Sequence, residues 1–175
     1  MVYYPLSVLM LAGIRDVLLI SRREHLPCYQ RLLGDGGRWG IRLDYIIQDK
    51  PIGLVHAFVL GREFVGSHLV ALILGDNLLY GHGLSAELTD AVARADGATV
   101  FAYYVNEPSQ YGVVKFDNEK PTQFLSNWAV TGLYFYDNAA ELRPSARGAL
   151  EISDVNRRYL QLKKFHVVKL GRGYA

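Results

Sequence analysis

An unbroken apolar run, residues 69–74 (LVALIL), ends abruptly at Gly75, Asp76 and Asn77. A run of this length is typical of a strand that is covered on both faces, as in a parallel sheet. Open α/β sheets bind their ligands at the carboxyl ends of such strands. We therefore expect Asp76 at the end of a central parallel strand, as a metal ligand or a hydroxyl acceptor. The same three residues also favour an ordinary turn.

Strand-like and helix-like segments alternate from residue 16 to residue 105. The expected strands cover 16–21, 41–47, 69–74 and 98–105, and the expected helices cover 5–13, 25–33, 53–60 and 86–95, the last capped by Ser85. This alternation is typical of βαβ units, which form a parallel sheet with helices on both faces.

The pattern changes after residue 105. Two strand-like segments, 111–116 and 128–136, follow each other without a helix between them. A helix is expected at 152–160, opened by Ser153 or Asp154, and a last strand at 165–170. The sequence predicts a single α/β domain over residues 1–175. Its fold is expected to be a three-layer, mostly parallel, Rossmann-like sheet with an antiparallel addition.

Composition limits the classes of partner. Half of the 175 residues are hydrophobic, 21% are charged and the net charge is +2, which is too mild to argue for nucleic acid. No apolar run approaches the roughly 20 residues of a membrane span. The only cysteine, Cys28, permits no intrachain disulfide and favours a reducing compartment. We expect a soluble, cytoplasmic protein that binds neither nucleic acid nor membrane, with Cys28 in the core.

Seven segments carry a further signal when they are taken together and in order. They are 3–7 (YYPLS), 30–36 (QRLLGDG), 48–54 (QDKPIGL), 74–77 (LGDN), 111–114 (YGVV), 119–121 (EKP) and 126–137 (SNWAVTGLYFYD). This ordered set, which runs through almost the whole chain, resembles the glucose-1-phosphate thymidylyltransferase family, also called dTDP-glucose pyrophosphorylase.

The resemblance implies a nucleotidyltransferase fold and a reaction. An oxygen of glucose 1-phosphate attacks the α-phosphorus of dTTP, which yields dTDP-glucose and pyrophosphate. Such a transfer depends on in-line positioning and on charge neutralisation, for which Mg²⁺ is the implied cofactor. The implied partners are dTTP, glucose 1-phosphate, dTDP-glucose and further copies of the chain in a homo-oligomer, expected as a homotetramer.

Three charged residues match functional positions of the family. The resemblance implies that Asp76 holds Mg²⁺, that Lys120 neutralises the sugar phosphate, and that Glu119 accepts sugar hydroxyls. Asp76 and Lys120 would thus be the catalytic residues, with Asp76 also on the nucleotide side. Without the resemblance, Glu119 and Lys120 would be interpreted as surface charges in a polar turn.

Four further residues match binding positions. Gln48 and Gly53 correspond to residues around the thymine, and Gly112 and Val130 to residues on the sugar side. An amide can both donate and accept hydrogen bonds, and a glycine lets a ligand approach the backbone closely. We expect Gln48 and Asp76 on the same edge of the sheet. The alternatives are a strand end for Gln48, a helix start for Gly53 and plain core for Val130.

The chain also departs from the family pattern. The family's glycine-rich phosphate loop and its lysine are not in this sequence, nor is its second metal-binding aspartate. Residues 1–175 alone are therefore expected to be inactive and to aggregate or pair with another copy. His56 stands where the family has glutamine, either as a substitute near the base or as a partly buried helix residue. The rival functions are an enzyme for UTP or CTP and a degenerate, non-catalytic sugar-nucleotide-binding or assembly relative.

Overall fold

The computed structural model describes residues 1–50, 52–94, 96–114, 126–137 and 151–171. Its elements in chain order are α1 (Tyr3–Leu11), β1 (Asp16–Ser21), α2 (Leu26–Leu33), the 3₁₀ turn η1 (Gly37–Trp39), β2 (Arg42–Ile47), α3 (His56–Leu60), α4 (Arg62–Val65), β3 (Val70–Ile73), α5 (Leu84–Ala93), β4 (Ala98–Tyr104), η2 (Pro108–Gln110), β5 (Trp128–Tyr136), α6 (Ile152–Gln161) and β6 (Phe165–Leu170).

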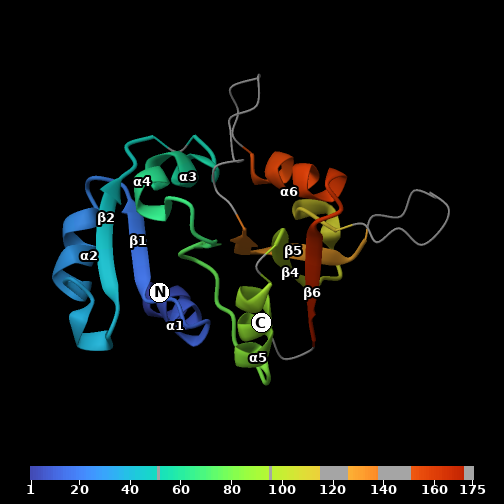
Figure 1. The fold of residues 1–175 in the computed structure, drawn as a ribbon, viewed down its shortest axis with the longest axis horizontal. Coiled ribbons are helices and arrows are strands. Elements are labelled where there is room, and N and C mark those ends of the chain that lie inside the picture. Colours follow the sequence, from blue (N-terminus) through green and yellow to red (C-terminus); the bar gives the residue numbers. More distant parts are fainter. Residues whose placement is uncertain (51, 95, 115–125, 138–150, 172–175) are drawn as a thin grey trace.

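The N-terminal part is a parallel βαβ unit. β1 and β2 pair in parallel from Asp16 beside Arg42 to Ser21 beside Ile47, and α2 connects them. A crossover connection of this kind is what brings two consecutive parallel strands together. Figure 1 shows this two-stranded sheet with α2 on its outer side. The prediction of a parallel unit here is confirmed.

The second sheet has four strands in the order β3-β5-β4-β6. β5 runs antiparallel to both of its neighbours, β3 and β4, whereas β4 and β6 are parallel. The mixed sheet, with β5 as the antiparallel addition, confirms the predicted α/β class. Residues of β5 alternate between two faces, as a strand requires. Leu133 and Phe135 pack on one side, and Tyr134 and Tyr136 pack on the other.

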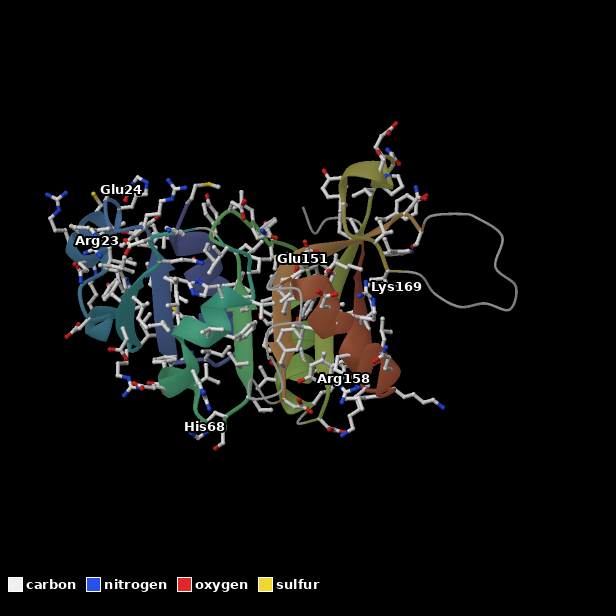
Figure 2. All side chains as sticks on the ribbon, turned by 90° about the horizontal axis from the view of Figure 1, so that it is seen from above. Arg23, Glu24, His68, Glu151, Arg158 and Lys169 are labelled. Atoms are coloured by element: carbon white, nitrogen blue, oxygen red, sulfur yellow. The ribbon has the colours of Figure 1, made fainter. Side chains whose placement is uncertain are left out.

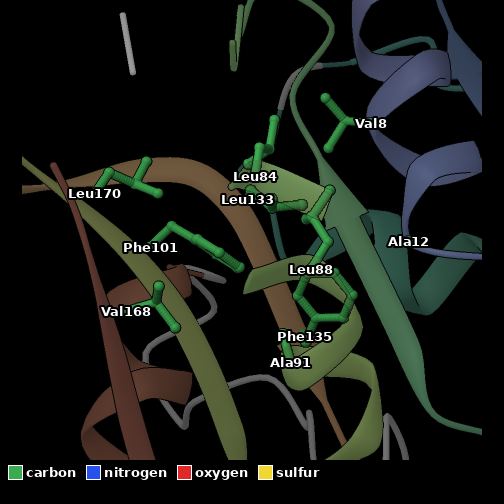
Figure 3. Packing of buried hydrophobic residues seen from close by; sticks show 10 residues of the cluster. All are labelled: Val8, Ala12, Leu84, Leu88, Ala91, Phe101, Leu133, Phe135, Val168 and Leu170. Atoms are coloured by element: carbon green, nitrogen blue, oxygen red, sulfur yellow. The ribbon is translucent and has the colours of Figure 1, made fainter. Parts of the chain in front are cut away.

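Helices cover both faces of this sheet and make three layers. On one face, α5 packs with α1 against β4, β5 and β6 (Figure 3); the buried residues are Val8, Ala12, Leu84, Leu88, Ala91, Phe101, Leu133, Phe135, Val168 and Leu170. On the other face lie α3 and α6, through Val55, Phe58, Val155 and Tyr159. Each face thus carries its own cluster of buried apolar residues, and burial of such side chains is the main stabilising term in folding.

α1 ties the two sheets together. Its Val8 and Ala12 belong to the core above the four-stranded sheet, whereas Leu6 and Leu9 pack with Val17 of β1.

Figure 2 shows Arg23 and Glu24 beside the first sheet, and Arg158 of α6 and Lys169 of β6 on the side of the second sheet. Among the described helices, none is long and apolar enough to cross a membrane.

Several predictions at the level of single residues are wrong. α5 begins at Leu84 after Gly83, whose left-handed backbone and carbonyl start the helix before Ser85 can cap it. α6 likewise begins after Glu151, without a side-chain cap. Cys28 is exposed rather than buried. It lies two positions after the buried Leu26, which puts it on the opposite side of α2.

The predicted strand at 111–116 is reduced, among the residues described, to one bridge. Val113 pairs with Ala129 of β5, and Val114 donates its N–H to the carbonyl of Trp128 at 3.0 Å. Residues 115 and 116 lie outside the described part of the chain. The bridge nevertheless places Gly112 beside β5.

Candidate functional site

Asp76 lies in the turn that follows β3, and a hydrogen-bonded network holds this turn against β5. The backbone N–H of Leu74 donates to the carbonyl of Gly132 at 2.9 Å. Asn77 bridges the two elements, because its Oδ1 accepts from the Gly132 N–H at 2.8 Å and its Nδ2 donates to Asp76 Oδ1 at 3.0 Å. Asp76 is exposed. The carboxylate is thus oriented from within the protein and open to a ligand.

Gly132 is required for this arrangement. A Cβ at this position would lie 2.7 Å from Asn77 Nδ2 and 2.7 Å from side-chain carbons of Leu74. A glycine inside a strand often marks a place where another part of the chain comes very close. Sequence reasoning did not assign a role to Asn77 or to Gly132. The signal was present, however, as an amide next to the candidate aspartate and a glycine within a strand-like run.

β3 is not the central parallel strand that the apolar run predicts. Within the described residues it pairs with β5 alone, in antiparallel fashion, and forms one edge of the four-stranded sheet. Its other edge faces a cavity of about 580 Å³ that is lined by β1, β3, α1, α3 and α4. Helices on both faces explain the apolar run without a central position. Asp76 does follow a strand end, but β3 does not give it the central position on which its predicted role was based.

Gln48 directly follows β2 and extends its ladder. Its backbone N–H donates to the carbonyl of Ser21 at 2.8 Å, and its side-chain Nε2 lies 3.0 Å from Nδ1 of His56, the first residue of α3. Gly53 lies between these two residues, exposed and with a φ of 97°. The structure therefore places both predicted base contacts in one loop, which a side-chain hydrogen bond closes.

The predicted sugar-side residues are also adjacent. The N–H of Val130 donates to the carbonyl of Gly112 at 2.8 Å. Gly112 is exposed, and a Cβ at this position would meet no heavy atom within 4 Å, so a ligand could approach the backbone there. Val130 is half-buried and packs against the core on the α3 and α6 side. It is therefore partly a core residue, as the alternative interpretation held.

β5 links two of the predicted groups. Val130 contacts Gly112, and Gly132, two residues further along, contacts the Asp76 turn through Asn77. Glu119 and Lys120 lie outside the described residues. In the part of the chain that the structure describes, no group of three or more His, Cys, Asp or Glu side chains is arranged to hold a metal ion. Among the described residues, the candidate site consists of the exposed carboxylate of Asp76, the exposed Gly53 and Gly112, and the Gln48 amide that bonds to His56.

These features define an α/β protein whose candidate ligand-binding residues lie after β2, after β3 and along the antiparallel strand β5. The sequence model of the family described as nucleotidyl transferase matches residues 1–174. The chain belongs to this nucleotidyl transferase family.

Individual proteins that are similar to this chain carry more specific names than the family does. The chain is 53% identical over 188 residues to the glucose-1-phosphate thymidylyltransferase of Xanthomonas campestris pv. campestris strain B100 and 54% identical over 188 residues to that of Neisseria gonorrhoeae. All of this chain is covered in both cases, but it spans only 64% and 65% of those relatives. A Bacillus anthracis crystal structure provisionally named a glucose-1-phosphate thymidylyltransferase, in complex with a sucrose, has a TM-score of 0.84 at 31% identity. That match covers 97% of this chain and 74% of the Bacillus chain.

Proposed function

We propose that this chain is part of a glucose-1-phosphate thymidylyltransferase. The enzyme would join dTTP and glucose 1-phosphate into dTDP-glucose and release pyrophosphate. The observation that carries the proposal is the identity of 53% and 54%, over the whole of this chain, to the Xanthomonas and Neisseria proteins of that name. The adjacency of Gly112 and Val130 and the closed loop at Gln48 support it.

The reaction makes one bond and breaks one. A phosphate oxygen of the sugar bonds to the α-phosphorus, the bond from that phosphorus to the bridging oxygen of the β-phosphate breaks, and pyrophosphate leaves with those electrons. The protein's contribution is to align the reactants and to neutralise charge. On the resemblance, Lys120 would neutralise the sugar phosphate and Glu119 would accept sugar hydroxyls, although both lie outside the described residues.

Asp76 is the residue that would hold Mg²⁺. When bound, Mg²⁺ would neutralise phosphate charge and orient the phosphate oxygens. An exposed aspartate fits this ion, which typically takes one or two carboxylates and fills its remaining positions with water and substrate oxygens. The hydrogen bond from Asn77 fixes one carboxylate oxygen of Asp76 in place.

The binding groups divide between two elements. Gln48 and Gly53, in the loop after β2, would contact the base of the nucleotide, where an amide offers both a donor and an acceptor. Gly112 and Val130 would contact the sugar, with the open space at Gly112 allowing a hydroxyl to approach the backbone. We extend the proposal to a homo-oligomer in the cytoplasm, where the single cysteine would remain reduced.

The test is turnover in the full-length protein, measured as pyrophosphate release from dTTP and glucose 1-phosphate across a magnesium titration. Asp76→Asn keeps the shape of the side chain and loses its charge, so turnover should fall by about 10²- to 10³-fold. Asp90→Asn, the same change on the exposed side of α5, is the matched control and should leave turnover intact. Equal activity of both variants would refute the metal role of Asp76.

Two rivals are separated in the same experiment. Faster pyrophosphate release with UTP or CTP than with dTTP would assign the enzyme to another base. Calorimetric binding of dTDP-glucose without any turnover would instead favour a non-catalytic sugar-nucleotide-binding protein.

A further inference from the structure

The hydrogen bond between Gln48 and His56 fixes more than the shape of its loop. Gln48 Nε2 lies 3.0 Å from His56 Nδ1, and both side chains are half-buried. An amide nitrogen only donates hydrogen bonds. With the amide nitrogen facing the ring, Nδ1 is the acceptor of this bond, an arrangement that corresponds to the tautomer with its proton on Nε2.

This hydrogen bond fixes where the remaining N–H donor and the carbonyl acceptor of the Gln48 amide lie relative to each other. One N–H is committed to His56. Among the described residues no other group bonds to this side chain, so the second N–H and the carbonyl oxygen are available to a ligand. A protonated or reversed imidazole would instead turn the amide over and exchange the positions of its donor and its acceptor. His56 therefore determines where the Gln48 side chain places its carbonyl oxygen and where it places its free N–H.

We propose that His56 is a positioning residue for base selection, because it holds the Gln48 amide in the order that suits thymine. The inference rests on the proposed contact between Gln48 and the nucleotide. Thymine offers an N–H donor at N3 next to carbonyl acceptors, which matches a carbonyl oxygen beside an N–H. Cytosine offers an acceptor at N3 beside an amino donor, so it needs the reverse order.

Without the His56 imidazole, the Gln48 amide could adopt either of its two flipped orientations at a similar free energy. The site would then discriminate less strongly against cytosine, because discrimination depends on the misfit that the wrong base experiences. The expected change is therefore in the ratio of affinities for the two nucleotides, and not in their common phosphate contacts.

The first measurement reads the tautomer directly. Long-range ¹H–¹⁵N correlation spectra of the histidine side chains, recorded in mildly alkaline buffer where imidazoles are neutral, should show His56 with its proton on Nε2. The His56→Asn variant identifies the signal by its loss. A proton on Nδ1 would overturn the inference, whatever the protein binds.

The second measurement is calorimetric binding of dTTP and dCTP by the full-length protein. His56→Leu should lower the preference for dTTP roughly tenfold, the usual size of one misplaced hydrogen-bond pair. His56→Asn, whose side-chain oxygen can still accept from Gln48, should recover much of the preference. His166→Leu on β6 makes the same change at an exposed position and should leave the ratio unchanged.

Gln48→Leu distinguishes the proposed contact between Gln48 and the base from the proposed role of His56. If this variant weakens dTTP binding while His56→Leu keeps the wild-type ratio, the proposed function stands and the role of His56 is refuted. If Gln48→Leu binds dTTP as well as the wild type does, the proposed base contact itself is wrong.

Discussion

Gly132→Ala should damage the Asp76 turn and the stability of the protein together. The new Cβ would lie 2.7 Å from both Asn77 Nδ2 and side-chain carbons of Leu74, whereas ordinary contact begins at 3.4 Å. One or both neighbours must therefore move by about 0.7 Å. Asn77 cannot move freely, because its amide also accepts from the Gly132 N–H at 2.8 Å and donates to Asp76 at 3.0 Å.

The expected loss follows from these contacts. Overpacking costs about 1–3 kcal/mol, and a strained or broken hydrogen bond adds about 1 kcal/mol. Replacing a glycine offsets about 0.4–1 kcal/mol by restricting the unfolded chain. The free energy of unfolding should fall by about 1–3.5 kcal/mol, and the melting temperature by roughly 2–14 °C for a domain of this size. Turnover of the full-length protein should fall too, because Asp76 moves with Asn77.

Gly112→Ala is the matched control for stability. A Cβ at Gly112 meets nothing within 4 Å, so the melting temperature should stay within about 1–2 °C of the wild type. Differential scanning calorimetry of the two variants in one buffer compares them directly. If Gly132→Ala melts at the same temperature as Gly112→Ala, the close approach between β5 and the Asp76 turn does not exist as described.

Two further predictions concern the C-terminal half. Asp137 accepts from the Gly97 N–H and from the Tyr159 hydroxyl, both at 2.7 Å, so Asp137→Asn should lower the free energy of unfolding by about 1–3 kcal/mol. An unchanged urea midpoint would contradict this. Burial, with smaller contributions from Tyr134 and Tyr159, raises the pKa of Tyr136. In the unfolded chain this tyrosine ionises at pH ~10, whereas in the folded protein it remains protonated at that pH. Its contribution to the free energy of unfolding is therefore complete below that pH and is lost as the pH rises beyond it. Tyr136→Phe should reduce that alkaline loss in urea titrations repeated at rising pH; an equally steep loss in the variant would exclude this tyrosine as its cause.

Hydrophobic periodicity predicted most of the secondary structure, because the patterns typical of strands and of helices are both clear in this sequence. The bounds of β1, β5 and β6 agree with the apolar segments at 16–21, 128–136 and 165–170. Helix starts were predicted less well. Gly83 and Glu151 precede α5 and α6, and neither helix uses the serine or aspartate that the pattern favoured. A capping side chain is a preference of about 1 kcal/mol, which the backbone conformation of a glycine can replace.

The positions of two candidate residues were predictable, because Gln48 and Asp76 follow strands that the pattern locates. Gln48 and Gly53, both assigned to the base, fall in one loop, and Gly112 and Val130, both assigned to the sugar, are hydrogen-bonded. The contacts that orient the site were not predictable. Asn77 meets Gly132 across 55 positions, and Gln48 meets His56 through a ring whose acceptor atom no sequence pattern specifies. The first contact depends on how the turn after β3 meets β5 and the second on the conformation of one loop, and one sequence without its fold fixes neither.

The position of β3 shows where the reasoning from a single strand fails. An apolar run reports that both faces of a strand are covered, and helices on the two sides of β3 do cover them. It does not report which strands lie along the edges, because edge pairing uses backbone groups that every residue carries. β3 could therefore have the sequence of a central strand and still, among the described residues, pair on one side and face a cavity of about 580 Å³ on the other. The case for Asp76 consequently depends on contacts along β5, where Asn77 and Gly132 hold the turn, and on the family to which the chain belongs.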